Sequence, residues 1–356
     1  MFKILDADGH VIERDADLLE YLDPPYRGNP VLLGYPFFPT LDGFQRGAIL
    51  ARNAMYKDYN ITAQTWLNFM DQVGIESTVL YPTAGLAAGM IQDPDWAIAV
   101  SKAYNDWFAD RYHRVSPSRL RGVALLPLQD PGEAAKELRR AVTELGMVGG
   151  LMVSNSADAG VRKPLGEPDF WPIYEEAERL GCPLAFHGAP SWGLGLEAFR
   201  QFAPSQSLEH PFAQMIQLTS VVLSGVLERF PTIRMAFLES GTAWIPFMMD
   251  RLDRAYEIWN SALYREFSDL VKKKPSDYLR EGRVFVSCEG SEETLAYALS
   301  RLGEGAVLYA SDFPHESNPE IAQREIQELA EREDLTEETK QRIFADNVAA
   351  FYRLQG

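Results

Sequence analysis

Residues able to bind a metal ion occur at three distant points of this sequence, and each follows a short apolar run. Asp8 and His10 end the first run, His187 ends a run in the middle of the chain, and Asp312 ends one near the carboxyl terminus. Imidazole and carboxylate groups together suit Zn²⁺, Mn²⁺ or Fe²⁺. A metal that keeps one coordination position open can bind water or substrate. The pattern therefore predicts a catalytic metal centre.

Each of these residues also has an ordinary structural explanation. A single histidine in a strand is usually a core or surface residue, and an aspartate after a strand often caps a helix. Three such strand ends in one chain favour the metal site. Asp8 and His10 are two residues apart, so their side chains point to the same side of a strand. We expect one divalent metal ion, with Zn²⁺ as the first choice and Mn²⁺ or Fe²⁺ as alternatives.

Short runs rich in Val, Ile, Leu and aromatic residues predict strands buried on both faces. They span Lys3–Asp8, Ser77–Tyr81, Gly122–Leu126, Gly149–Val153, Pro183–His187, Arg234–Glu239, Arg283–Cys288 and Ala306–Asp312. Helical patterns follow over Thr62–Val73, Asp95–Arg114, Gly132–Leu145, Asp169–Leu180, Phe212–Arg229, Ala243–Asn260, Glu292–Leu302, Pro319–Glu333 and Glu337–Tyr352. Alternating strands and helices pair in parallel through right-handed crossovers. Eight such units predict a single-domain (β/α)₈ TIM barrel over residues 1–356.

Two stretches interrupt this alternation, namely residues 14–61 after the first strand and residues 189–211 after the fifth. Both leave from the carboxyl ends of strands, where barrel enzymes build their active sites. We predict that they are insertions that cover a substrate. For residues 14–61, a surface excursion with its own small core is an equally good interpretation. Arg52, Trp192 and His210 lie in these stretches and are candidate substrate-binding residues.

The composition narrows the class of protein. The chain has 34 Lys and Arg residues against 51 Asp and Glu residues, a formal net charge of −17. Nucleic acid and anionic membranes are therefore poor partners, and a small molecule is the expected ligand. No apolar run reaches the length of a membrane span. Two cysteines form no disulfide framework, and a strand that begins at Phe2 leaves no room for a signal peptide, so we expect a cytoplasmic protein.

These motifs resemble those of the amidohydrolase superfamily, in the amidohydrolase-related branch that includes aminocarboxymuconate semialdehyde decarboxylase. The resemblance covers nearly the whole chain. It rests on Asp6-x-Asp8-x-His10, Phe186-His187-Gly188 and Ser311-Asp312-Phe313-Pro314-His315, with softer support from Tyr104-Asn105-Asp106-Trp107 and Phe230-Pro231. Members of this branch are expected to have a TIM barrel and to act on small molecules. Family resemblance also suggests a homodimer.

The resemblance implies one catalytic divalent metal. His10 matches the second histidine of the family's His-x-His pair, Asp8 occupies the first position, and His187 matches the ligand of strand five. Asp312 matches the aspartate of strand eight, which in the family binds the metal and exchanges protons with its water. A metal-bound water has its pKa lowered to about 7, which gives a hydroxide nucleophile at neutral pH.

This chain departs from the family pattern after strand six. Glu239 stands where relatives usually carry a histidine that serves as an acid or base, which makes decarboxylation less secure than hydrolysis. A glutamate there can be a general base, an extra metal ligand or a proton donor. It can also be a carboxylate near the amino terminus of the next helix. Glu289 after strand seven and His315 after strand eight are further candidates for substrate contact.

We therefore predict a metal-dependent hydrolase that attacks a carbonyl-type bond of a small cyclic or aromatic substrate, with Asp312 and Glu239 as catalytic residues. The alternative is a metal-dependent, non-oxidative decarboxylase of an aromatic or muconate-like acid. A third alternative, of another class, is an inactive barrel that only binds a ligand.

Overall fold

The computed structural model describes residues 2–29, 36–39, 60–157, 160–189, 193–260, 269–315 and 317–354. Eight strands form one sheet in chain order, and each pairs in parallel with the next. They are β1 (Leu5–His10), β2 (Ser77–Tyr81), β3 (Leu120–Leu125), β4 (Gly149–Val153), β5 (Leu184–His187), β6 (Met235–Phe237), β7 (Val284–Cys288) and β8 (Val307–Tyr309). Nearly every strand residue is buried, as the apolar runs require.

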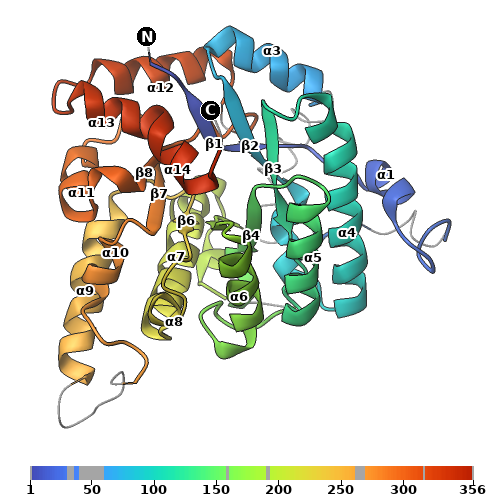
Figure 1. Cartoon of the computed structure of the whole chain (residues 1–356), viewed down its shortest axis with the longest axis horizontal. Helices are drawn as coiled ribbons and strands as arrows, with labels where there is room; N and C mark the ends of the chain where they lie inside the picture. The colour runs from blue at the N-terminus through green and yellow to red at the C-terminus, as the bar shows by residue number, and fades with distance from the viewer. Residues whose placement is uncertain are drawn as a thin grey trace.

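Backbone bonds join the end of β8 to β1 and so bring the two edges of the sheet together. The Asp312 N–H donates to the Asp8 carbonyl at 2.9 Å, and the His10 N–H donates to the Phe313 carbonyl at 2.8 Å. Helices surround the strands, as Figure 1 shows. The predicted (β/α)₈ barrel is therefore confirmed, and the carboxyl ends of all its strands face one side of the molecule.

The helices that cover the barrel follow the strands in the predicted order. They are α1 (Asp15–Leu18), α3 (Ala63–Val73), α4 (Pro94–Arg111), α5 (Pro131–Thr143), α6 (Trp171–Leu180), α7 (Phe202–Leu223), α8 (Val226–Arg229), α9 (Trp244–Trp259), α10 (Pro275–Leu279), α11 (Leu295–Leu302), α12 (Pro319–Glu331), α13 (Glu337–Gln341) and α14 (Asn347–Tyr352). Among the described residues, no helix is long and apolar enough to cross a membrane.

The largest error in a predicted helix boundary falls after β5. The helix after β5 begins at Phe202, ten residues before the predicted start, and it contains Pro211. A proline usually ends or begins a helix, which is why the sequence placed the boundary there. The segment between β5 and α7 is consequently shorter than residues 189–211, and His210 lies on the helix. After β1, the described part of residues 14–61 includes α1 and a short 3₁₀ turn over Leu19–Tyr21.

Two strands end two or more residues earlier than predicted, at Phe237 in β6 and at Tyr309 in β8. The residues that follow turn into the left-handed region, with φ of 58° at Glu239 and 48° at Asp312. Few residues other than glycine adopt this conformation, and such strain gathers at functional sites. The apolar pattern reaches these positions, but the backbone leaves the sheet before them.

The packing of α3 against β1 holds the first candidate ligands in place. The Trp66 ring is fully buried, and its Nε1–H donates to the His10 carbonyl at 2.9 Å. A Cβ atom on Gly9 would lie 2.3 Å from this ring. Glycine at position 9 therefore allows α3 to approach the strand segment that carries Asp8 and His10.

Candidate metal centre

Asp8 and His10 point into the barrel from β1, and both are fully buried. The Nδ1 atom of His10 lies 2.9 Å from the Pro82 carbonyl oxygen. A carbonyl can only accept a hydrogen bond, so Nδ1 carries the hydrogen and Nε2 of the neutral ring presents a lone pair. Burial, with His315 adding to its effect, lowers the pKa of His10 to about 4 and keeps the ring neutral.

His187, the last residue of β5, is held in the same way. Its Nδ1 lies 2.7 Å from the Gly188 carbonyl oxygen, and its Nε2 lies 3.3 Å from Asp8 Oδ1. Burial alone would lower the pKa of His187, but Glu239 and Asp8 outweigh it and raise the pKa to about 9. The acidic surroundings thus favour a positive charge at this point, either a proton on Nε2 of His187 or a cation between His187 and Asp8.

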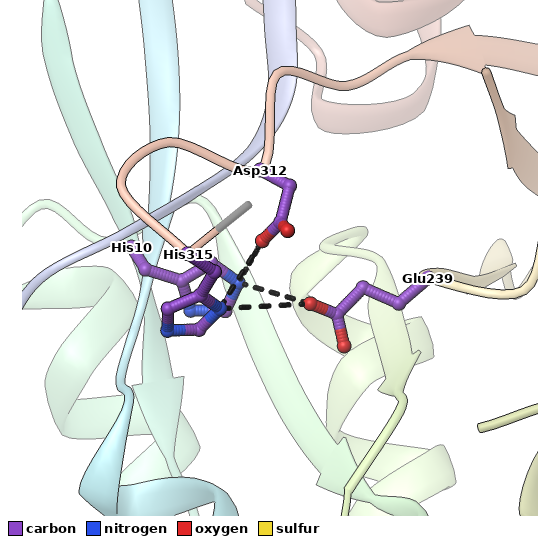
Figure 2. Close-up of side chains that lie close together, drawn as sticks. All are labelled: His10, Glu239, Asp312 and His315. Carbon is purple, nitrogen blue, oxygen red and sulfur yellow. Dashed lines mark ion pairs between the residues drawn. The ribbon is translucent and has the colours of Figure 1, made fainter. Parts of the chain in front are cut away.

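Asp312 approaches the same point from the turn after β8. Its Oδ1 lies 3.5 Å from His10 Nε2 and 3.1 Å from His315 Nδ1. Burial raises the pKa of Asp312, and the charge of Glu239 adds to this effect. The side chains of Asp312 and Glu239 point toward the paired rings of His10 and His315 in Figure 2.

Asp6 fixes the turn that carries Asp312. Its two carboxylate oxygens accept hydrogen bonds from the Ser311 N–H and hydroxyl, both at 2.8 Å, and from the Thr78 hydroxyl at 2.7 Å. Burial raises the pKa of Asp6 to about 7, and these bonds act against that rise. Asp6 therefore connects β1, β2 and the turn after β8 behind the site.

Glu239 lies beyond the end of β6, on the other side of the two histidines. Its N–H donates to the Ser287 hydroxyl at 3.0 Å. Its Oε1 lies 3.6 Å from His10 Nε2, and its Oε2 lies 3.4 Å from His187 Nδ1. Burial alone would raise the pKa of Glu239, but the surrounding histidines lower it well below its usual range, so this carboxylate is ionised at neutral pH.

A cavity of ≈ 600 Å³ opens onto this cluster, a size that suits a small-molecule ligand. Asp8, Glu239 and Asp312 line its floor, and the predicted substrate-binding residues His210, Glu289 and His315 line it as well. Arg52 and Trp192, the other two predicted substrate-binding residues, lie outside the described residues. The His210 ring faces Glu239, with Nδ1 at 3.7 Å from Oε2.

The donor atoms fit a divalent metal ion. Buried atoms without a hydrogen-bond partner include Asp8 Oδ2 and His10 Nε2. Unpaired buried polar atoms are costly unless they serve a ligand. Two overlapping sets of residues bring their ligand atoms close enough for an ion, one with Asp8, His10 and His187, the other with His10, Glu239, Asp312 and His315. We favour the first set, because two backbone carbonyls hold His10 and His187 with Nε2 directed inward. We add Asp312 to this set, because its Oδ1 lies 3.5 Å from His10 Nε2.

Several supporting residues were not foreseen from the sequence. Thr83 and Glu13 lie in turns after β2 and β1, and Ser287 lies within β7. The Thr83 hydroxyl lies 2.8 Å from His315 Nε2, and Glu13 accepts the Thr83 N–H at 3.0 Å. Each is a polar residue within or just beyond an apolar strand, which is the signal that could have found them. Nothing in the sequence says which side chain each one meets.

Comparison with known proteins finds decarboxylases among the relatives of this chain. It is 32% identical over 300 residues to a gamma-resorcylate decarboxylase of Rhodococcus jostii, covering 81% of this chain and 86% of the relative. It is 25% identical over 274 residues to a 2-amino-3-carboxymuconate-6-semialdehyde decarboxylase of Dictyostelium discoideum, covering 76% of this chain and 71% of the relative.

Solved structures share the fold over nearly the full length. A 5-carboxyvanillate decarboxylase of Novosphingobium aromaticivorans, solved with manganese and 4-hydroxy-3-methoxy-5-nitrobenzoic acid, superposes with a TM-score of 0.73 at 21% identity, covering 99% of this chain and 96% of that one. The family model described as amidohydrolase matches residues 6–354. The chain belongs to the amidohydrolase family of enzymes.

Proposed function

We propose that this protein is a metal-dependent, non-oxidative decarboxylase of an aromatic or muconate-like carboxylic acid. The relatives named gamma-resorcylate and 2-amino-3-carboxymuconate-6-semialdehyde decarboxylase support this reaction over hydrolysis, which the sequence had favoured. The structurally similar 5-carboxyvanillate decarboxylase acts on an aromatic acid and binds manganese. These similarities move the decarboxylase from the alternative to the leading hypothesis.

Asp8, His10, His187 and Asp312 would hold a single divalent ion, and nitrogen and carboxylate ligands suit Mn²⁺ as well as Zn²⁺. When bound, the ion would attract the substrate carboxylate and a neighbouring oxygen and would balance the negative charge of the site. The Pro82 and Gly188 carbonyls keep Nδ1 of the two histidines protonated, which leaves Nε2 of each free for this role.

The observation that carries the proposal is the buried carboxyl group of Asp312 at the cavity floor. In decarboxylation the bond between a carbon and the carboxylate breaks, CO₂ leaves, and the same carbon takes up a proton. Burial and Glu239 raise the pKa of Asp312, so this group can hold a proton for transfer to the substrate carbon. A proton donor beside a site for an anionic substrate is what this reaction needs.

Hydrolysis is the second candidate, and Glu239 is the observation that favours it. An ionised carboxylate 3.6 Å from His10 Nε2 can take a proton from a nucleophilic water. The two reactions differ in their products, so a direct assay separates them.

The test is an assay of the purified protein, loaded in parallel with Mn²⁺ and with Zn²⁺, against hydroxybenzoic acids that carry a hydroxyl group next to the carboxylate. We expect release of CO₂ and formation of the corresponding phenol. Hydrolysis of esters or lactones without any CO₂ from the acids would overturn the proposal in favour of the hydrolase. Turnover of neither class by metal-loaded protein would favour the inactive barrel.

Asp312→Asn tests the proposed proton donor. We expect kcat to fall by about 10²- to 10⁴-fold, the range for loss of a general acid. Asp250→Asn is the control, since Asp250 pairs with Arg301 on the helical surface away from the cavity. The metal content of each variant, measured by mass spectrometry, separates loss of the proton donor from loss of the ion. A metal-loaded Asp312→Asn enzyme with unchanged kcat would remove Asp312 from this role.

A further inference from the structure

The turn after β2 contacts both imidazoles that lie side by side at the site. The Pro82 carbonyl accepts from His10, and the next residue, Thr83, contacts His315. Buried Glu13 holds the turn by accepting the Thr83 N–H at 3.0 Å and the Gly85 N–H at 2.6 Å. These two hydrogen bonds to Glu13 therefore fix the backbone at Thr83.

The hydrogen bonds of Thr83 determine which nitrogen of His315 carries a hydrogen. The Thr83 hydroxyl lies 2.7 Å from the Val11 carbonyl oxygen, which can only accept, so its single hydrogen points there. The hydroxyl oxygen must then accept from His315 Nε2, at 2.8 Å. Nε2 therefore carries a hydrogen, and Nδ1 is the ring nitrogen that faces Asp312.

His315 Nδ1 is directed at the proposed proton donor. His315 Nδ1 lies 3.1 Å from Asp312 Oδ1, and the His315 ring stacks on His10 with centroids 3.9 Å apart. Figure 2 shows the two rings together below Asp312. In this orientation a hydrogen bond can join His315 Nδ1 and the Asp312 carboxyl group, whereas a flipped ring would place a carbon atom there.

We propose that Thr83 is a positioning residue that holds His315 in this orientation, with Nδ1 facing Asp312, during turnover. This inference rests on the proposed decarboxylation, in which Asp312 supplies the proton. His315 lines the cavity and Thr83 is not among the described residues that do, so the proposed role of Thr83 is exerted through His315.

The experiment compares Thr83→Val, which has nearly the same shape without a hydroxyl, with Thr83→Ser, which keeps the hydroxyl. Loss of a residue that orients a group of a metal site typically costs on the order of 10- to 100-fold. We expect that loss in kcat for Thr83→Val, an unchanged KM, and recovery of kcat in Thr83→Ser. Thr219→Val is the control, because Thr219 donates a similar bond to the Met215 carbonyl on α7.

A second measurement does not depend on activity. Proton–nitrogen correlation spectra of the Zn²⁺-loaded protein, labelled at histidine nitrogens, report the tautomer of His315, and a His315→Gln variant assigns its signals. We expect a hydrogen-bonded Nε2–H of His315 in wild type and Thr83→Ser, and loss of that hydrogen bond in Thr83→Val. Unchanged spectra or an unchanged kcat in Thr83→Val would overturn the positioning role. If the wild type releases no CO₂ while the tautomer still depends on Thr83, the proposed reaction fails and the positioning of His315 stands.

Discussion

At the scale of single residues, charge decides how the site works. His10 and His187 both direct Nε2 toward the carboxylate of Asp8, an arrangement that needs a proton or a cation between the rings and this carboxylate. Glu239 adds a further negative charge, and its left-handed backbone conformation holds it there at a cost in conformational energy. The cluster is thus stabilised by the ion that we propose it binds.

Glu239→Gln separates the possible roles of this residue. It removes the charge and keeps the shape, so we expect metal affinity to fall on the order of 10- to 100-fold, as for other groups around a metal. At saturating metal a decarboxylase should keep most of its kcat. A hydrolase that used Glu239 as its base would lose about 10²- to 10⁴-fold even then.

The measurements for Glu239→Gln are a metal titration of the stripped protein and kcat at saturating Mn²⁺. Glu293→Gln is the control, since Glu293 is an exposed residue just before α11. Wild-type metal affinity in Glu239→Gln would show that this carboxylate has no part in holding the ion.

At the scale of elements, ion pairs join neighbouring helices of the outer layer. Glu176 on α6 accepts two hydrogen bonds from Arg139 on α5, both at 2.9 Å, and further bonds from Arg179 on its own helix. Burial alone would raise the pKa of Glu176, but the two arginines outweigh it and lower the pKa to about 2. These contacts connect α5 to α6 far from the cavity.

Glu176→Gln should therefore lower stability at neutral pH without changing kcat. A carboxylate with a depressed pKa contributes stability above its unfolded pKa of about 4.3, and that contribution is lost as the pH falls toward about 2. Because both arginines are about half exposed, the loss should be about 1 kcal/mol or less. Urea denaturation of wild type and variant at pH 7 and pH 3.5 checks this. A stability difference that grows at the lower pH would contradict it.

At the scale of the whole molecule, the barrel brings together residues that are far apart in sequence. Asp8 and His10 lie on β1, His187 ends β5, and Asp312 follows β8. Closure of the sheet directs all four side chains to one face of the barrel. The homodimer suggested by the family resemblance stays a prediction.

Removal of the metal should destabilise the entire fold. The carboxylates of Asp8, Glu239 and Asp312 would repel one another without a cation, and a bound ligand stabilises by about 2.7 kcal/mol at a concentration 100 times its Kd. We expect a chelator such as dipicolinic acid to abolish turnover and to lower the melting temperature by several degrees, and added Mn²⁺ to restore both.

Two variants control the chelation experiment. His10→Ala should lose the metal-dependent shift in melting temperature, because it lacks a proposed ligand. His113→Gln should keep the shift, since His113 contacts the Leu120 carbonyl on the outside of the barrel. Equal shifts in both variants would place the ion elsewhere.

The sequence by itself predicted the barrel, because apolar strands alternate with amphipathic helices at a regular spacing. It also marked Asp8, His10, His187 and Asp312, since a polar residue that ends an apolar strand in a barrel points to the active-site face. The start of α7 could not be predicted, because a proline within a helix looks the same in sequence as one at its beginning.

Only the tertiary structure decided how these residues are held and protonated. The contacts of Asp6 with Ser311, of Thr83 with His315 and of Glu239 with Ser287 join residues from different strands, and no local pattern specifies such partners. The same is true of the pKa shifts, which arise from burial and from charges brought close by barrel closure. The sequence determined which groups can do the chemistry, and the fold determined their distances, orientations and charge.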